Sequence, residues 1–181
     1  MPIKLQSSSG GSVTVNIPVT ASNYNVTVPA ATGTAMVSGN MPAFSVYTND
    51  SSSYFASATQ TKVRFNTLMF DTNNNFDAVT NYRFTPTVAG YYQFSAKVLT
   101  NTGGSGGQQI LYLYKNGSEI AEFEQLYIGQ NATGTTGSYL AYANGSTDYF
   151  EIYGFQSSGS TKAIYTNSQQ TYWTGFLARA A

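Results

Sequence analysis

The chain contains no cysteine and no histidine among its 181 residues. Without cysteine there is no disulfide framework and no thiolate to act as a nucleophile or a metal ligand. Without histidine, the side chain that most often serves as a general base near neutral pH is missing. We therefore expect a protein that is not an enzyme and that needs no cofactor.

Charge is also scarce. Charged residues make up 9% of the chain, with eight basic and eight acidic side chains, whereas ordinary soluble domains contain about 25%. A neutral chain does not attract a polyanion, so we expect no nucleic-acid partner. The apolar runs are too short to span a membrane, and no apolar export signal follows Met1. Because low charge costs solubility, the surface is typical of a stable oligomer or of a particle.

The sequence alternates apolar and polar residues in many places and shows little helical periodicity. Examples are Val13 to Ile17, Lys62 to Asn66 and Leu111 to Tyr114. This period of two is typical of half-buried strands. Asn116-Gly117 and Asn144-Gly145 lie between such runs and predict hairpin turns. The sequence therefore predicts an all-β sandwich or barrel.

Two parts of the chain differ in composition. Residues 1–40 contain a single aromatic residue and a single charge, and their segments VNIPVTA and VTVPAAT form a weak repeat. Such a segment cannot bury enough surface to fold alone. It is either a disordered leader or, as we favour, a β-rich anchor or short shaft that docks through Val13, Val15, Ile17, Val26 and Val28. Residues 41–181 form the main domain, in which we expect 128–137 to be an exposed loop.

The stretch TPTVAGYYQFSA, residues 85–96, indicates how the core is built. Pro86 and Gly90 predict a turn, after which Tyr92, Phe94 and Ala96 point to one face of a strand. The small Ala96 is expected to make room for a bulky neighbour. The predicted core residues are Phe65, Phe76, Phe84, Tyr92, Phe94, Phe176 and Leu177.

These spaced aromatic residues resemble the C1q/TNF-like jelly-roll family. The matching residues are Phe65, Asp71, Phe76, Phe84, Gly90, Tyr92 and Phe94. AFSVY (43–47) resembles the first strand of the family, and YWTGFLA (172–178) resembles its closing strand. The pattern departs by one extra residue between Phe76 and Phe84 and by alanine at position 96. The likeness covers roughly residues 42–179 and implies a jelly-roll sandwich.

The resemblance also implies a homotrimer, because domains of this family are typically trimeric. Tyrosine suits an interface, since it buries a large area and keeps a polar tip. Six tyrosines that alternation places outside the core are the candidate interface residues: Tyr91, Tyr112, Tyr114, Tyr127, Tyr142 and Tyr153.

Two ligand hypotheses remain. Asp71, Asn73, Asn75 and Asp77 supply oxygen atoms in one short loop, which makes them weak candidates for calcium. Their spacing is not that of an EF-hand, and a turn built on asparagine is the preferred interpretation. Exposed tyrosines and neutral amides also suit a glycan, but they suit a protein partner equally well.

The function that we predict is that of a trimeric phage virion structural protein on the virion surface. It is a capsid decoration protein or head fibre that contacts other virion proteins through residues 1–40. A short tail fibre that recognises a host surface glycan is the first alternative. A soluble C1q-like recognition module is the second.

Overall fold

The computed structural model describes residues 3–16, 19–20, 23, 30, 37, 39 and 41–181. The chain divides into two compact units, Met1–Gly33 and Thr34–Ala181. Of the predicted docking residues, Val13 and Val15 are described, whereas Ile17, Val26 and Val28 lie outside the described residues.

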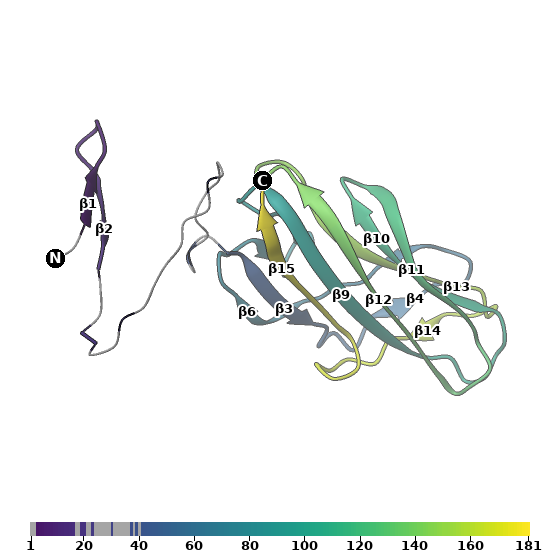
Figure 1. Cartoon of the computed structure of the whole chain (residues 1–181). Helices are drawn as coiled ribbons and strands as arrows, with labels where there is room; N and C mark the ends of the chain where they lie inside the picture. Colours follow the sequence, from purple (N-terminus) through teal and green to yellow (C-terminus); the bar gives the residue numbers. More distant parts are fainter. Residues whose placement is uncertain are drawn as a thin grey trace. The chain divides into compact units, whose positions relative to one another are not determined.

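The first unit contains a β-hairpin of β1 (Ile3–Gln6) and β2 (Ser12–Val15) (Figure 1). Ile3 pairs with Val15 and Leu5 pairs with Val13, so the four apolar side chains share one face of the hairpin. All four are more than half exposed. Because an isolated two-stranded hairpin is at best marginally stable in water, this face needs a partner.

The second unit is built from two main antiparallel sheets (Figure 1). The five-stranded sheet has the order β12 (Ala132–Ala143), β9 (Gly90–Asn101), β15 (Tyr172–Ala180), β3 (Ala43–Tyr47), β6 (Thr67–Asp71). The six-stranded sheet has the order β11 (Ser118–Tyr127), β10 (Gln108–Lys115), β13 (Phe150–Gln156), β8 (Arg83–Phe84), β7 (Phe76–Asp77), with β5 (Thr61–Lys62) also beside β13. A small pair consists of β4 (Tyr54–Phe55) and β14 (Lys162–Ala163). The described residues contain no α-helix, which confirms the predicted all-β jelly-roll sandwich.

The turns follow the sequence in one place and depart from it in two others. Asn116 and Gly117 join β10 to β11 with φ values of 53° and 79°, as the hairpin signal predicts. Asn144 and Gly145 lie between β12 and β13, which belong to different sheets, so the hairpin predicted there is wrong. The predicted exposed loop 128–137 is wrong at both ends. Ile128 is fully buried, and β12 begins at Ala132 and pairs with β9 along its whole length. Thr133 and Thr135 are buried there. A run rich in threonine and glycine is polar, yet it forms a strand when a long neighbour supplies the backbone hydrogen bonds.

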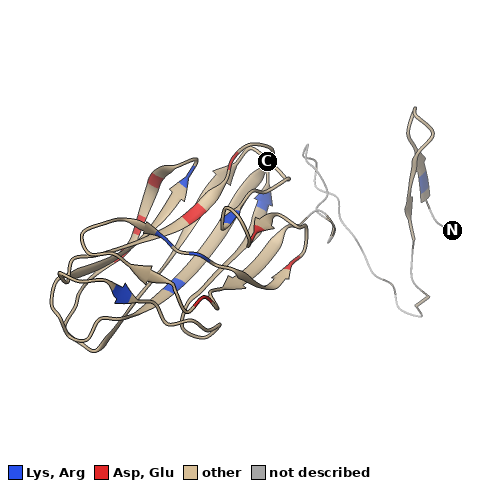
Figure 2. Ribbon diagram, turned by 180° about the vertical axis from the view of Figure 1, so that it is seen from behind, with Lys and Arg blue, Asp and Glu red and all other residues tan. Residues whose placement is uncertain are grey.

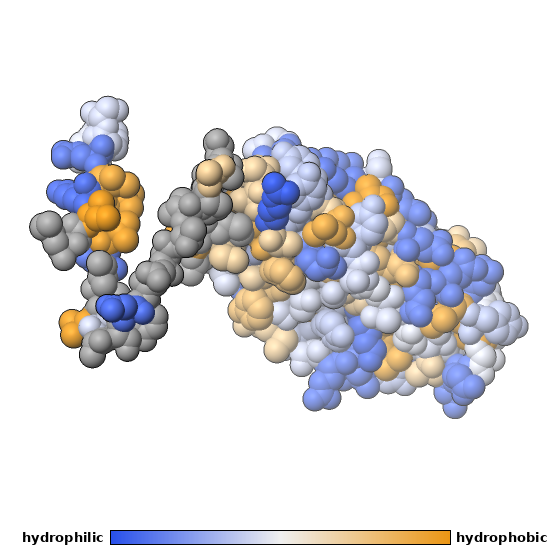
Figure 3. Space-filling view, viewed as in Figure 1, coloured by the Kyte–Doolittle hydropathy of each residue, from blue (hydrophilic) through white to orange (hydrophobic). Residues whose placement is uncertain are grey.

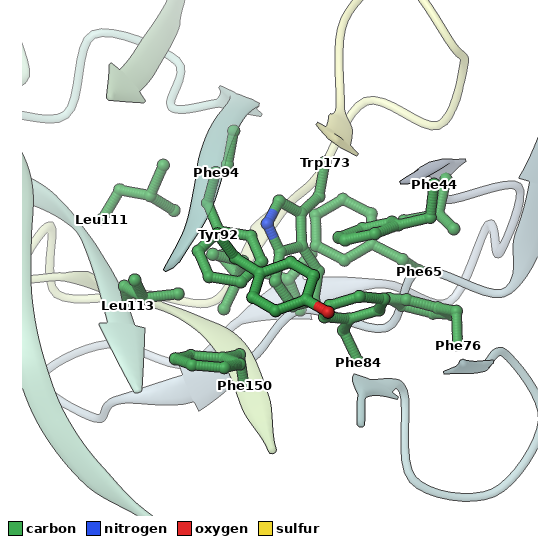
Figure 4. Packing of buried hydrophobic residues seen from close by; sticks show 14 of the residues in the cluster. Phe44, Phe65, Phe76, Phe84, Tyr92, Phe94, Leu111, Leu113, Phe150 and Trp173 are labelled. Atoms are coloured by element: carbon green, nitrogen blue, oxygen red, sulfur yellow. The ribbon is translucent and has the colours of Figure 1, made fainter. Parts of the chain in front are cut away.

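The core between the two sheets is dominated by aromatic rings (Figure 4). Phe94 lies near Phe84, Phe150 and Trp173, with ring centroids 4.7–6.0 Å apart. Trp173 is fully buried and pairs in register with Ala96, so the small alanine leaves space for the indole. Six of the predicted core residues are buried: Phe65, Phe76, Phe84, Tyr92, Phe94 and Leu177.

Phe176 is the exception among the predicted core residues. Its side chain is 51% exposed, whereas that of the adjacent Leu177 is 1% exposed. Neighbouring residues in a strand point to opposite faces of the sheet, so both cannot reach the core. The inward position before Leu177 is Gly175, where the rings of Phe44 and Phe94 fill the space that a side chain would occupy.

Candidate assembly face

The outward side of the five-stranded sheet exposes large apolar side chains. We call these residues the apolar face: Met69, Phe70, Tyr91, Leu140, Tyr142 and Phe176. Their exposed fractions run from 42% to 59%. Eight of the twelve exposed large apolar side chains of residues 41–181 lie on β6, β9, β12 and β15 of this sheet. A monomer rarely concentrates exposed apolar residues in this way, which marks the sheet as an interaction surface.

Strand register brings these residues together. Tyr91 and Tyr142 are paired across β9 and β12, and their rings meet edge to face with centroids 5.5 Å apart. Gln93 lies two residues after Tyr91 on β9 and so on the same face of the sheet. It pairs with Leu140 of β12 on one side and with Phe176 of β15 on the other. Apolar side chains of the head, and those of the β1–β2 hairpin, are visible in Figure 3.

The edge strand β6 contributes the part of the apolar face that sequence reasoning missed. Leu68, Met69 and Phe70 are consecutive and all exposed. Met69 receives a hydrogen bond from Ser45 Oγ to its sulfur atom at 3.5 Å. Three successive exposed apolar residues on an edge strand are a liability unless a partner covers them. The run LMF in the sequence was the signal that could have revealed it.

The outward side of the six-stranded sheet is different, because its large side chains are covered by other side chains of the same chain. The rings of Tyr114 and Tyr153 lie 4.2 Å apart, and the Tyr114 hydroxyl donates a hydrogen bond to Gln60. Tyr112 is only 7% exposed. Burial raises the pKa of Tyr112, Tyr114 and Tyr153 above the usual tyrosine value, since the charged form is disfavoured where water is excluded.

A buried carboxylate anchors this second surface. Glu151 has a side-chain exposure of 3% and pairs with Lys62 Nζ at 2.7 Å and with Arg83 Nε at 3.3 Å. The Arg83 guanidinium also lies 4.1 Å from the ring centroid of Tyr149. Figure 2 shows how few charged residues the head carries and how dispersed they are. This trio therefore stands out as one of the few charge clusters in the described part of the chain.

The six candidate interface tyrosines fall into three places. Tyr91 and Tyr142 belong to the apolar face. Tyr112, Tyr114 and Tyr153 lie on the six-stranded sheet. Tyr127 belongs to the same sheet but lies at the end of its edge strand β11, where it is 77% exposed. Alternation tells which side of its own strand a residue occupies, but not which sheet the strand joins.

The predicted calcium ligands are engaged in two separate turns. Asp71 accepts hydrogen bonds from the amides of Asn73 and Phe76, and Asn75 bonds with Thr87. Asp77 accepts bonds from the amides of residues 79–81. These bonds, that of Thr80 above all, lower the pKa of Asp77 to about 2. Among the described residues, no three His, Cys, Asp or Glu side chains are grouped so as to hold a metal ion.

The sandwich, its strand order and its aromatic core define a jelly-roll domain of the C1q/TNF type. The family model of the C1q domain matches residues 43–178, and the chain belongs to the C1q domain family. In the described part of the chain, no helix is long and apolar enough to cross a membrane.

Solved structures with the same fold include proteins of different kinds. The globular domain of zebrafish complement 1qA protein is 21% identical, with 77% of this chain and 99% of that chain covered and a TM-score of 0.54. Eiger TNF from S. frugiperda is 6% identical, with 78% and 95% covered and a TM-score of 0.56. PRD1 vertex protein P5 is 13% identical, with 78% and 98% covered and a TM-score of 0.50. No curated protein matches the chain. At these identities the likeness shows the fold alone.

Proposed function

We propose that this protein is a non-enzymatic, homotrimeric structural protein of a phage virion that displays its C1q-like head on the particle surface. Residues 1–40 attach it to other virion proteins. The observation that carries the proposal is the exposed apolar face of the five-stranded sheet.

The apolar face supports a trimer because it is incomplete in a single chain. Six large side chains there are about half exposed, and burying such groups stabilises an assembly by about 25 cal/mol per Å² of apolar area. Arg179 and Lys97 are the cations on this side of β9 and β15, so little charge has to be desolvated. Closed threefold symmetry would cover the face in every copy without leaving an open edge.

The hairpin of β1 and β2 supports attachment through the N-terminal unit. Its four apolar residues are exposed and its only charged side chain is Lys4. The same chemistry suits docking on a virion protein or on the hairpins of the other two copies. The low charge of the whole chain and the shared fold of a vertex protein agree with a place on a particle, and we favour decoration of the capsid over a tail fibre.

Light scattering tests the trimer. We expect the full chain to have three times the mass of one copy, and the double variant Tyr91→Ser, Phe176→Ser to be a folded monomer. Tyr127→Ser removes an exposed tyrosine outside the apolar face and should remain trimeric. A monomeric wild-type chain at micromolar concentration would refute the assembly.

Particle binding tests the placement. The full chain should band with density-purified particles of the source culture, whereas a chain that lacks residues 1–40 should form a trimer that stays in the soluble fraction. Absence of the full chain from particles would contradict the virion role. Loss of folding on the deletion would contradict the two-part division.

A further inference from the structure

A cleft of about 300 Å³ lies on the head, and its wall contains none of the residues of the apolar face. Its wall includes Tyr54, Thr61, Lys62, Arg64, Tyr82 and Ile164. No residue of its wall belongs to the five-stranded sheet, so the cleft and the apolar face are built from different residues. Its volume is at the lower end of the range for small-molecule sites.

The two cations of the cleft, Lys62 and Arg64, are held in place by other residues, yet each keeps at least one N–H group that can bind a ligand. Arg64 Nη2 pairs with Asp50 at 2.7 Å and donates to the carbonyl oxygen of Ser52 at 3.1 Å. Both contacts use the same nitrogen, which leaves the N–H groups on Nε and Nη1 for a ligand. The Arg64 side chain is 41% exposed. Lys62 is fixed by Glu151 at 2.7 Å and by the Asn81 carbonyl oxygen at 3.3 Å, so one of its three donors is left.

The charge around the cleft is nearly balanced. Lys62 and Arg64 of the wall pair with the carboxylates of Glu151 and Asp50, and the neighbouring Arg83 contacts Glu151 and pairs in register with Asp77. A polyphosphate or a polyanion would demand more cations than this, whereas a single carboxylate needs only the donors that Arg64 and Lys62 have left.

The aromatic part of the wall is held in an unusual conformation. Tyr82 has a φ of 51°, in the left-handed region that a bulky side chain rarely adopts and that is enriched at ligand sites. The preceding turn is fixed by Asp77, whose carboxylate accepts hydrogen bonds from three successive amides. The other tyrosine of the wall is Tyr54, which lies in β4 of the small β4–β14 pair and is 52% exposed. Tyrosine rings offer flat apolar surfaces and hydroxyl groups together.

We propose that this cleft binds an acidic saccharide, with a sugar carboxylate on Arg64 and Lys62 and the sugar ring against Tyr54 and Tyr82. Thr61 and the tyrosine hydroxyls then hydrogen-bond the sugar hydroxyls, and Ile164 contacts the apolar side of the ring. This site is independent of the trimer and of the placement on a particle, because none of its residues takes part in either.

Titration calorimetry of the full chain tests the site with two tetrasaccharides. One alternates glucuronic acid and N-acetylglucosamine, and the other is the neutral tetramer of N-acetylglucosamine. We expect the acidic probe to bind with a Kd below about 1 mM and the neutral probe to bind at least about tenfold more weakly, because it offers no carboxylate. Lack of binding of the acidic probe at about 10 mM, or equal binding of both, would overturn the proposal.

Variants locate the site. Arg64→Gln should weaken binding of the acidic probe about tenfold through the lost charge-assisted bonds. Tyr82→Asn, which tolerates a positive φ, should weaken it as well. Lys4→Gln removes one cation from the hairpin and Tyr127→Ser removes an exposed tyrosine, and both should bind like wild type. A matching loss in these two controls would overturn the location.

A competition experiment separates a saccharide site from a general anion site. Sodium sulfate and sodium chloride at equal ionic strength should lower the affinity for the acidic probe to the same small extent. Selective displacement by sulfate would show that the cleft recognises an anion alone, which would overturn the saccharide assignment.

Discussion

The two sheets of the head have outward faces of opposite character. On the five-stranded sheet, the side chains of Tyr91, Tyr142 and Phe176 are about half exposed to solvent. On the six-stranded sheet, the rings of Tyr114 and Tyr153 pack against each other and a buried carboxylate pairs with two cations. The first face leaves large apolar side chains exposed in the single chain, whereas side chains of the second face pack and pair with one another.

This difference teaches where stability and assembly reside. Removing a side chain from a self-covered face breaks contacts within the chain, so it lowers the free energy of unfolding. Removing a side chain from an uncovered face costs the single chain little, because that side chain makes few contacts within its own chain. Substitutions on the two faces should therefore separate the two properties.

Glu151→Gln should have the largest effect on stability. The change leaves Lys62 and Arg83 without the carboxylate that both contact. Breaking a buried ion pair costs about 3–5 kcal/mol, and the 27% exposure of the two cations lowers this to about 2–3 kcal/mol. Urea unfolding measures the loss. Asp50→Asn disrupts the more exposed pair with Arg64 and should cost less than about 1 kcal/mol; equal losses would contradict the special role of Glu151.

Tyr92→Phe tests the core that both sheets share. The buried Tyr92 hydroxyl donates to the carbonyl oxygen of Val88 at 2.7 Å, and losing this bond should cost about 1 kcal/mol. Desolvation raises the pKa of Tyr92 to about 12, whereas an unfolded tyrosine titrates near 10.

The sign of the pH dependence follows from these two pKa values. The folded chain keeps the Tyr92 proton at a pH where the unfolded chain releases it, so the stabilisation is complete below about pH 10 and is lost as the pH rises to about 12. Denaturant unfolding at about pH 8 and about pH 11 should show a smaller alkaline loss for Tyr92→Phe than for wild type. The same loss in both proteins would contradict this assignment.

Tyr114→Phe probes the self-covered face more gently. The variant keeps the ring that packs against Tyr153 and loses the hydrogen bond to Gln60, which should cost about 0.5–1 kcal/mol. Thermal unfolding of the variant beside Tyr127→Phe, whose ring is 77% exposed, provides the comparison. The control should unfold like wild type, and a larger loss in the control would reverse the ranking of the two positions.

Phe176→Ser should have the smallest effect on the single chain, within about 0.5 kcal/mol. Its effect should instead appear in assembly. The melting temperature of an oligomer rises with protein concentration, whereas that of a monomer does not, so we expect the rise in the wild type and not in the variant. Calorimetric scans at two concentrations tenfold apart measure this. A large loss of stability in the dilute variant would show that Phe176 supports the fold of its own chain.

Local patterns in the sequence were sufficient for much of the fold. Period-two alternation and the Asn116-Gly117 turn predicted strands that the structure contains, because both signals act between near neighbours in the chain. The spaced aromatic residues from Phe65 to Phe94 predicted the jelly-roll family, and Ala96 predicted a bulky neighbour, which is Trp173. The polar run 132–137 was predicted as a loop because its strand character comes from pairing with β9.

What the sequence by itself determined is which residues alternate, where the turns lie and that the chain has an aromatic core without catalytic chemistry of the histidine or cysteine kind. What only the tertiary structure decided is the sheet on which each strand lies. That choice put Tyr91 and Tyr142 on the apolar face with Met69 and Phe70, and it put Tyr112, Tyr114 and Tyr153 on the opposite sheet. It also brought Arg64 and Tyr82 to one cleft. The physical reason is that alternation is a property of one strand, whereas strand order arises from hydrogen bonds between segments far apart in the chain.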